Sequence, residues 1–448
     1  MSTDRDFERA RQLDAAGRDD QAARAYLALL ERDPAHFGAL TNLANLMERR
    51  GFTAAARQGY REAARFHPDN PVAHTNFGAS LLDAGELEAA RVAFERALEL
   101  APENEQAHQG LSAIFARLGD DAAAQLHRAL GFRESVVHQP FHGDGTAPNV
   151  IVLLSAGGGN VDLRQFLDDR RYDLWKIFVD APGAPGELPP HDLVVNAIGD
   201  AERSGDALER AAQLVASSAS VINAPEAVLQ TSRLGNAERF AGIPGVRVPR
   251  VQLVRRDALR AFASSRDGSA FLLRSPGHHS GEHFVRIETA AQLDDEVARL
   301  PGSELLAIDY LDVRGSDGKF RKYRIMTVGG KLYPLHLAIS SHWKVHYFSS
   351  QTLSEPSHRA EEERFLDDAA GALGSTPIAA LEAVAGALKL DYAGIDFSLD
   401  PAGKVVVFEA NATMTIPRLS EAPADYRKPA LERACKAVEG LLSSRAQA

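Results

Sequence analysis

The feature that most constrains this chain is a repeat of 34 residues that runs through its N-terminal third. Four sets of positions share this period, and each set keeps one kind of residue. They are the glycines Gly17, Gly51, Gly85 and Gly119, the alanines Ala22, Ala56, Ala90 and Ala124, the aromatic residues Tyr26, Tyr60 and Phe94, and the prolines Pro34, Pro68 and Pro102. This pattern predicts a helix, a turn at the Gly, a second helix with a small Ala at the contact, and a Pro that ends the unit.

At these positions the chain resembles the tetratricopeptide repeat (TPR) family, over three full units and a partial fourth that ends near Leu130. In the fourth unit Arg128 stands where the aromatic residue belongs, as in a unit that caps a stack. The resemblance implies an all-α helical repeat array over residues 1–131, with a concave surface for a protein or peptide partner or for a second copy of the chain in a homodimer. An array that only supports the next domain is the alternative, because a repeat does not reveal its ligand.

The composition narrows the class of protein. A length of 448 residues suggests several domains, and a hydrophobic content of 45% with 25% charged residues is typical of soluble globular proteins. The formal net charge of −11 argues against a nucleic-acid partner. The single cysteine, Cys435, allows no internal disulfide and fits a reducing compartment. Because no signal peptide and no membrane-spanning apolar run is present, we expect a cytoplasmic protein without a membrane partner.

The middle of the chain has the pattern of a linker followed by an α/β domain. Residues 132–148 have no strong period and are rich in His, Pro and Gly, which predicts a linker. We expect strands at 149–154, 174–179, 193–197 and 220–223, with helices after the first strand and at 207–217, hence a parallel sheet. The run Gly157–Asn160 either presents backbone amides to an anion or forms a tight turn. It lacks the spacing of a dinucleotide fingerprint, so a nicotinamide cofactor is not expected.

The strongest chemical signal lies near the C-terminus, where residues 394–399 and 405–411 have strand character and flank a turn. Glu409 and Asn411 are two residues apart and share a strand face, which Asp396 on the partner strand can join. Two carboxylates and an amide oxygen are hard ligands of the kind that Mg²⁺ takes. A solvated hairpin with acids by chance is the alternative. Because Glu409 follows four apolar residues at the end of a strand, an unpaired carboxylate would be costly there, which favours the metal site.

At these residues the chain resembles the ATP-grasp superfamily, in which an Asp followed by Glu-x-Asn forms the magnesium site. Further segments match that family in order along the chain. They are Asn223–Pro225 at the opening of the nucleotide-binding region, Ile243–Pro249 at the entry to the first lobe, Phe271–Gly281 for the strand and loop over the phosphates, Leu305–Tyr310 for the adenine hinge, and Arg321–Arg324 on a strand that leads to a turn. The resemblance covers roughly residues 149–440. It implies a pre-ATP-grasp α/β domain over 149–222 and an α+β ATP-grasp catalytic domain over 223–448.

The resemblance also implies ATP and Mg²⁺ as cofactors and assigns a role to each matching residue. The metal ligands are Asp396, Glu409 and Asn411. The nucleotide contacts are Arg233, Arg274, His279, Gly281, Leu306, Ala307, Ile308, Asp309 and Lys344. The catalytic pair is Arg324 and Lys322, which share a strand face. The family usually has Lys where Arg233 and Arg274 stand, but a guanidinium keeps the charge and can bridge two phosphate oxygens.

Three histidines, His336, His342 and His346, stand close together in the sequence. Their spacings of six and four residues match no compact zinc motif. Two interpretations stay open, a place for His336 in the wall of an acceptor pocket and ordinary structural hydrogen bonds for all three.

These patterns predict an ATP-dependent ligase that forms a carbon–nitrogen bond and produces ADP. Its substrates would be a small-molecule or peptide carboxylate, activated as an acyl phosphate, and an amine. The first alternative is an adaptor that binds nucleotide as a switch without turnover, and the second is a phosphotransferase on the same fold. The sequence does not name the acid or the amine, because acceptor pockets in this superfamily consist of variable loops.

Overall fold

The computed structural model describes residues 2–447, except 144, 278–280, 282, 346–349, 351, 353 and 418–425. The chain divides into two compact units. The first holds residues 2–147 and 167–186, and the second holds residues 148–166, 187–417 and 426–447. Each unit has hydrophobic clusters of its own.

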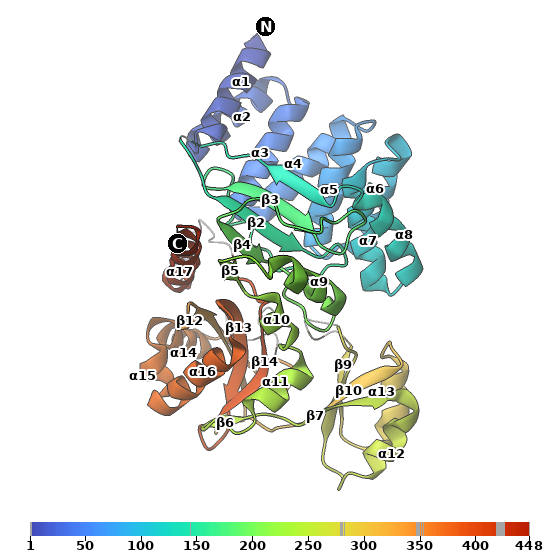
Figure 1. Ribbon diagram of the computed structural model, residues 1–448, viewed down its shortest axis with the longest axis vertical. Coiled ribbons are helices and arrows are strands. Elements are labelled where there is room, and N and C mark those ends of the chain that lie inside the picture. Colours follow the sequence, from blue (N-terminus) through green and yellow to red (C-terminus); the bar gives the residue numbers. More distant parts are fainter. Residues whose placement is uncertain are drawn as a thin grey trace. The chain divides into compact units, whose positions relative to one another are not determined.

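The first unit begins with eight helices that form four consecutive pairs over residues 2–131 (Figure 1). Each pair is turned at a periodic glycine, and the φ angles of Gly17, Gly51, Gly85 and Gly119 are +68°, +83°, +78° and +77°. Glycine adopts this left-handed region without steric cost, which explains why Gly recurs at the turn of every helix pair. The helices are α1 (Ser2–Ala15), α2 (Asp19–Arg32), α3 (Phe37–Arg49), α4 (Thr53–Phe66), α5 (Pro71–Asp83), α6 (Leu87–Leu100), α7 (Glu105–Leu118) and α8 (Asp121–Gly131).

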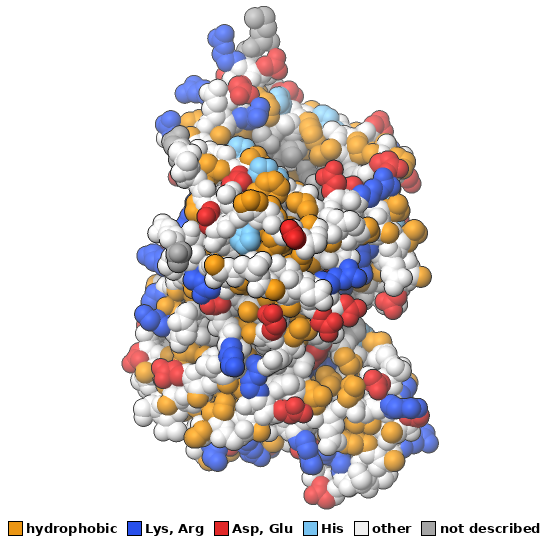
Figure 2. All heavy atoms as spheres, in the orientation of Figure 1, with side chains coloured by type: hydrophobic (Ala, Val, Ile, Leu, Met, Phe, Trp, Pro, Cys, Tyr) orange, Lys and Arg blue, Asp and Glu red, His pale blue; other side chains and the backbone are white. Residues whose placement is uncertain are grey.

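The periodic aromatic residues fill the space between successive helix pairs, as the sequence predicts. Phe94 on α6 is buried, and a Cβ atom added to Gly78 or Gly110 would come within 2.9 or 2.3 Å of its ring. Tyr26 and Tyr60 are buried in the same way. The predicted TPR-like helical repeat array is therefore confirmed. Basic and acidic side chains are interspersed on the face of this array that Figure 2 shows.

The segment expected to be a linker contains a short strand. Strand β1 (Val136–Gln139) lies within residues 132–148 and pairs antiparallel with β3 (Asp173–Phe178). The ring of Phe132, at the end of α8, packs edge-on against Phe178 at 4.7 Å between centroids. The linker prediction did not include this strand, because β1 is too short and too exposed to show an alternating pattern.

The second unit contains three parallel strands, β2 (Asn149–Leu154), β4 (Leu193–Asn196) and β5 (Val221–Ile222). Their expected positions and direction are confirmed. The helices of this part are α9 (Gly205–Val215), α10 (Pro225–Leu229) and α11 (Arg233–Phe240). The helix expected after β2 is absent, because residues 161–172, all described, form turns and irregular backbone instead.

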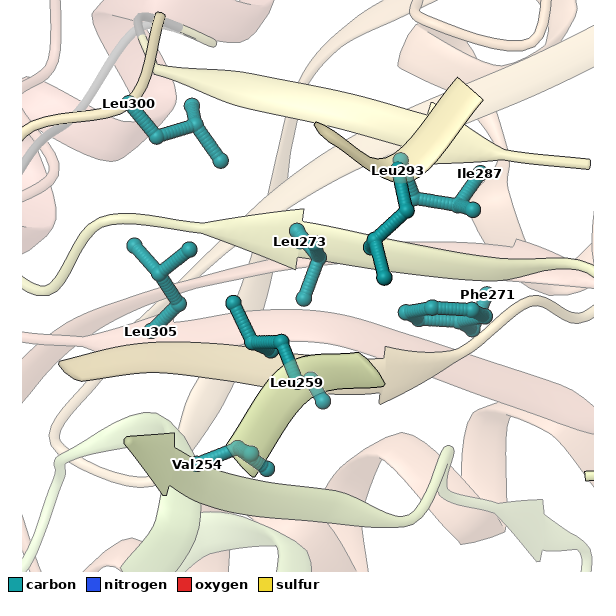
Figure 3. Close-up of a cluster of buried hydrophobic side chains, with 9 residues drawn as sticks. Val254, Leu259, Phe271, Leu273, Ile287, Leu293, Leu300 and Leu305 are labelled. Carbon is teal, nitrogen blue, oxygen red and sulfur yellow. The ribbon is translucent and has the colours of Figure 1, made fainter. Parts of the chain in front are cut away.

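A four-stranded antiparallel sheet follows in the order β7-β10-β8-β9. Its elements are β7 (Val251–Arg255), η1 (Arg256–Ala258), α12 (Leu259–Ser264), β8 (Phe271–Arg274), β9 (Phe284–Ile287), η2 (Ala290–Gln292), α13 (Leu293–Ala298) and β10 (Glu304–Asp309). Figure 3 shows the core of this lobe, where Leu259 and Leu293 from the helices lie over Phe271 and Leu273 of the sheet. Burial of these side chains stabilises the lobe.

The third sheet of the second unit has the order β12-β11-β13-β14-β6. Helices α14 and α17 pack on β12, and α16 packs on β14. The elements are β6 (Val246–Arg247), β11 (Phe320–Val328), β12 (Lys331–Ser340), α14 (Pro356–Asp367), α15 (Ala369–Leu373), α16 (Ser375–Leu388), β13 (Tyr392–Leu399), β14 (Val405–Asn411) and α17 (Lys428–Ala446). Across the described part of the chain, none of the helices combines the length and apolar character that a bilayer crossing requires.

Candidate functional site

A cleft of about 580 Å³ opens in the second unit between the four-stranded sheet and the sheet that contains β11, β13 and β14. One wall comes from β8, β9 and β10, and the other from β11, β13 and β14. Its volume lies within the range of small-ligand sites, about 300–1,000 Å³. Apolar side chains in its lining include Leu272, Phe284, Ile308, Leu311, Val406 and Phe408.

The β13–β14 hairpin brings the predicted metal ligands together. Asp396 lies directly opposite Glu409 in the strand register, and Asn411 lies opposite Gly394. A β-bulge follows Asp396, and the turn at Asp400 closes the hairpin with a hydrogen bond from the Asp400 N–H to the Lys404 carbonyl. Both carboxylates line the cleft. The shared face expected from the spacing of these residues is therefore present.

Asp396 is buried and paired with two cations on β11. Arg324 donates from Nε to Oδ1 at 2.6 Å and from Nη2 to Oδ2 at 2.8 Å, and Lys322 donates from Nζ to Oδ2 at 3.0 Å. Burial alone would raise the pKa of Asp396, but the charges of Arg324 and Lys322 hold it at about 2. Asp396 is thus ionised at neutral pH, and it fixes the predicted catalytic pair at the cleft wall.

His336 lies next to this group, and it is not among the described residues that line the cleft. It is the strand partner of Arg324 and is buried. Burial, followed by the charge of Arg324, lowers the pKa of His336 well below its ordinary value. The imidazole is therefore neutral at physiological pH. His342 lies just after β12, and His346 lies outside the described residues.

Glu409 belongs to a second charge group, whose side chains are partly shielded from solvent, at 10–23% exposed. Its Oε1 accepts hydrogen bonds from Arg233 Nη2 at 2.8 Å and from Asn411 Nδ2 at 3.0 Å. Arg233 also donates from Nη1 to Glu202 Oε2 at 2.6 Å and from its backbone N–H to Glu202 Oε1 at 3.0 Å. Burial alone would lower the pKa of Arg233, but Glu409 and Glu202 raise it. One guanidinium therefore joins two carboxylates from different elements.

Arg274, at the end of β8, is buried against the ring of Phe284, with 5.3 Å from its guanidinium carbon to the ring centroid. Burial, and then the positive charge of Arg233, lower the pKa of Arg274 to about 10. The positive charge of Arg233 thus disfavours the charged form of Arg274, and Glu409, Glu202 and Asp200 offset this in part. An anion between the two guanidinium groups would relieve the repulsion between them.

The residues of the predicted adenine hinge lie in two different environments. Ile308 and Asp309 line the cleft, together with Tyr310, which follows them. Leu306 and Ala307 are buried instead in strand β10, where they pair with β7 on one side and β8 on the other. The backbone of Ile308 is paired on both sides as well, so the four predicted hinge residues differ in their side chains, of which only those of Ile308 and Asp309 line the cleft.

The predicted loop contacts are described only in part. Gly281 and Lys344 both line the cleft, and Lys344 donates from Nζ to the Phe284 carbonyl at 3.3 Å. Gly281 has a φ of +75°, which favours glycine, and a Cβ atom there would lie 2.7 Å from Lys344 Cε and would displace the end of that side chain. Burial, followed by the charge of Arg274, lowers the pKa of Lys344. The predicted contact His279 lies outside the described residues.

The described lining of the cleft carries more positive than negative side chains, which gives it a net charge of +3. The cations are Arg203, Arg233, Arg274, Arg321, Lys322, Arg324 and Lys344, and the anions are Asp200, Asp309, Asp396 and Glu409. The whole chain has a net charge of −11. A positive cleft in an acidic protein favours an anionic ligand.

Sequence reasoning missed Asp200, Glu202 and Arg203, which follow β4 and lie at the cleft or next to it. A signal for them existed, because ligands of α/β sheets bind beyond the carboxyl ends of parallel strands. It also missed Phe408, which is exposed to the cleft from β14. The predicted glycine run reaches the cleft through Gly159 and Asn160.

The oxygen donors of the hairpin fit a magnesium ion in part. Asp396 and Glu409 offer carboxylate oxygens from neighbouring strands. The Oδ1 of Asn411 accepts hydrogen bonds from Thr413 N–H and Oγ1, so its amide nitrogen faces Glu409. Among the described residues, no three His, Cys, Asp or Glu side chains form a metal-binding group. The two carboxylates fit an ion that also takes phosphate and water ligands, and Asn411 would need to turn its amide to join them.

Comparisons with known proteins add little beyond the repeat array. None of the known protein-family models matches the chain, and no curated protein matches it. Similar solved structures include MamA, at 21% identity and a TM-score of 0.26 over 27% of this chain and 71% of that one, and MamA from Desulfovibrio magneticus RS-1, at 21% and 0.26 over 28% and 71%. The first TPR domain of Spaghetti (RPAP3), bound to an HSP90 peptide, has 26% identity and a TM-score of 0.25 over 26% and 93%. These scores are too low to support an argument, and the array is identified by its own geometry.

Proposed function

We propose that the second unit is an ATP-grasp ligase that binds ATP and Mg²⁺ in the cleft and activates a carboxylate for attack by an amine. The observation that supports this most is the pair Asp396 and Glu409, which face each other in a cleft of net positive charge. A triphosphate needs such cations, and a divalent ion needs such carboxylates.

The reaction has two steps. A carboxylate oxygen of the acid attacks the γ-phosphorus of ATP, the bond to the β-phosphate oxygen breaks, and ADP leaves. The amine nitrogen then attacks the acyl carbon, the carbon–oxygen bond to phosphate breaks, and inorganic phosphate leaves while the amine loses its proton to phosphate or water. The protein contributes mainly by positioning the reactants and neutralising charge.

In this proposal the cations of the cleft have separate tasks. Arg324 and Lys322, oriented by Asp396, stabilise the charge on the transferred phosphoryl group. Arg274, which lines the cleft from the end of β8, binds the phosphates. A magnesium ion held by Asp396 and Glu409 would neutralise phosphate oxygens.

The adenine base of ATP would lie against the apolar part of the cleft. Ile308 and Phe408 supply flat apolar surface from the two facing sheets, and Asp309 stands at the end of β10 next to them. Asp309 is tied to Arg266 at 2.9 Å, which fixes the end of the strand. This arrangement supports a planar ring bound between the two sheets.

For the first unit we propose a protein or peptide partner, or a second copy of the chain, on the repeat array. Stacked helix pairs form extended surfaces that suit such partners. A cytoplasmic location also remains a proposal, supported by the single buried cysteine, Cys435.

One observation favours the nucleotide-switch alternative. Glu409, a predicted metal ligand, already forms an ion pair with Arg233, with 2.8 Å between Oε1 and Nη2. Turnover therefore decides between the two functions, and the identity of the acceptor separates a ligase from a phosphotransferase.

The test is ATP-dependent ADP release by the full chain, with Mg²⁺, over a panel of carboxylic acids with and without amines. A ligase releases ADP only when an acid is present, and its amide product requires the amine. Arg324→Ala should abolish turnover while the affinity for nucleotide changes less. Asp257→Asn, at an exposed site in the same unit, is the control and should retain full activity. Nucleotide binding without ADP release on any acid would establish the switch, and the absence of nucleotide binding would refute the proposal.

A further inference from the structure

Glu202 makes an unusual set of contacts beside the cleft. Its carboxylate accepts the backbone N–H of Arg233 at 3.0 Å and the Arg233 Nη1 at 2.6 Å. It also accepts the backbone N–H of Gly277 at 3.3 Å, from the segment that follows β8. The side chains of Arg233 and Glu202 are only 10% and 12% exposed. The carboxylate is therefore well shielded from water and well supplied with donors.

These donors are the kind that a phosphate group uses. A phosphate is bound by guanidinium groups and by backbone N–H groups at helix N-termini and in glycine loops. Arg233 is the first residue of α11, so its N–H points out of the helix end, and Gly277 has a φ of +72°. Glu202 is thus an anion of this chain that occupies phosphate-type donors at the edge of the cleft.

The arrangement also gives a reason for arginine at position 233. Its Nη1 reaches Glu202 and its Nη2 reaches Glu409 at the same time. A lysine ammonium is a single point of charge and does not span two carboxylates in this fixed geometry. Arg233 therefore suits a site in which an internal acid is held until another anion replaces it.

We propose that Glu202 is an internal competitor of the nucleotide phosphates, which must displace its carboxylate from Arg233 and Gly277 in order to bind. This inference rests on the proposed binding of nucleotide in the cleft. Its consequence is a lower affinity of the wild-type protein for nucleotide than the cations of the cleft would otherwise give. A residue that merely positions Arg233 would have the opposite effect, because its loss would weaken binding.

The experiment is calorimetric titration of the full-length protein with AMP-PNP in the presence of Mg²⁺. Glu202→Gln should lower the Kd by about three- to tenfold, the typical net value of one hydrogen bond regained by the ligand. Glu226→Gln is the matched control, since it makes the same change of charge at an exposed site on α10 in the same unit. Its Kd should stay within about twofold of the wild-type value.

The outcomes are distinct. A lower Kd for Glu202→Gln but not for Glu226→Gln supports the competitor. An equal or higher Kd for Glu202→Gln, with measurable wild-type binding, overturns it. If neither the wild type nor Glu202→Gln binds AMP-PNP, the proposed function itself is refuted. If Glu202→Gln melts far below the wild type, Glu202→Asp replaces it, because the shorter side chain keeps the charge but loses the contacts, and its Kd should also fall.

Discussion

The helical array and the cleft differ in how far their ion pairs are exposed to solvent. In the array the described buried side chains include no Asp, Glu, Lys or Arg, and the ion pairs lie at the surface, as between Arg96 and Asp69, whose side chain is 86% exposed. In the cleft the ion pairs are buried, as between Lys322 and Asp396, whose side chain is 3% exposed. The same chain thus keeps its charges in water in one region and desolvates them in the other.

This difference bears on function. Surface ion pairs contribute about 0–1 kcal/mol, so those of the array serve mainly solubility. Buried pairs lose much of their attraction to desolvation and are weak stabilisers compared with an apolar core. Two buried pairs that share one cleft are therefore poorly explained by stability alone, and they favour a site built to bind a charged ligand.

The largest test of this contrast is Asp396→Asn. The variant leaves Arg324 and Lys322 facing a neutral amide, and an uncompensated buried charge costs about 3–5 kcal/mol. We expect a clear fall in the thermal midpoint of the second unit, and ADP release reduced by at least about 100-fold. Differential scanning calorimetry and the turnover assay measure the two effects. Full turnover in the variant would remove Asp396 from the proposed site.

The array was predictable from sequence because its information is local and repeated. Each 34-residue unit contains its own turn glycine and its own buried aromatic residue, so the period alone predicts the helix pairs. The β13–β14 hairpin was predictable for a related reason. Its turn and the two-residue spacing of Glu409 and Asn411 determine which side chains share a face.

The remainder of the site depends on contacts between distant segments. Glu202 and Arg233 are 31 positions apart, and Arg233 and Glu409 are 176 apart, so no local pattern reveals that they meet. Leu306 and Ala307 were assigned to the hinge by position in a motif, whereas the structure buries their side chains and leaves Ile308 and Asp309 of that segment in the cleft lining. Sequence patterns predict faces of single elements well, but they do not predict how distant elements meet.

A second test addresses the apolar side of the contrast. Phe94→Ala removes a ring that packs against Gly78 and Gly110, and such a truncation costs about 3–4 kcal/mol. The array should therefore lose helix content at a lower temperature in circular dichroism, while AMP-PNP binding by the second unit stays unchanged. An unchanged melting curve would contradict the assigned role of the periodic aromatic residues.

A third test uses pH. The folded-state pKa of Asp396 is about 2, below the ordinary value of about 3.9. A depressed pKa means that the ionised carboxylate stabilises the fold above about pH 4, and that this contribution, about 2–3 kcal/mol, is lost as the pH falls towards 2. The difference in unfolding free energy between wild type and Asp396→Asn, measured by urea denaturation, should therefore shrink from pH 5 to pH 3. A constant difference would contradict the buried ion pair as its source.

The smallest expected effect completes the contrast, because it applies the same chemical change to the array. Asp69→Asn removes the partner of Arg96 at 3.2 Å, but Arg96 also pairs with Glu99 at 2.9 Å, and the carboxylate of Asp69 lies in water. We expect a change in unfolding free energy of no more than about 0.5 kcal/mol, reduced further by salt. Urea denaturation at low and high ionic strength measures it. A loss as large as that of Asp396→Asn would mean that the surface charges of the array carry structure, and the inference that buried charges mark the functional region would then lose its basis.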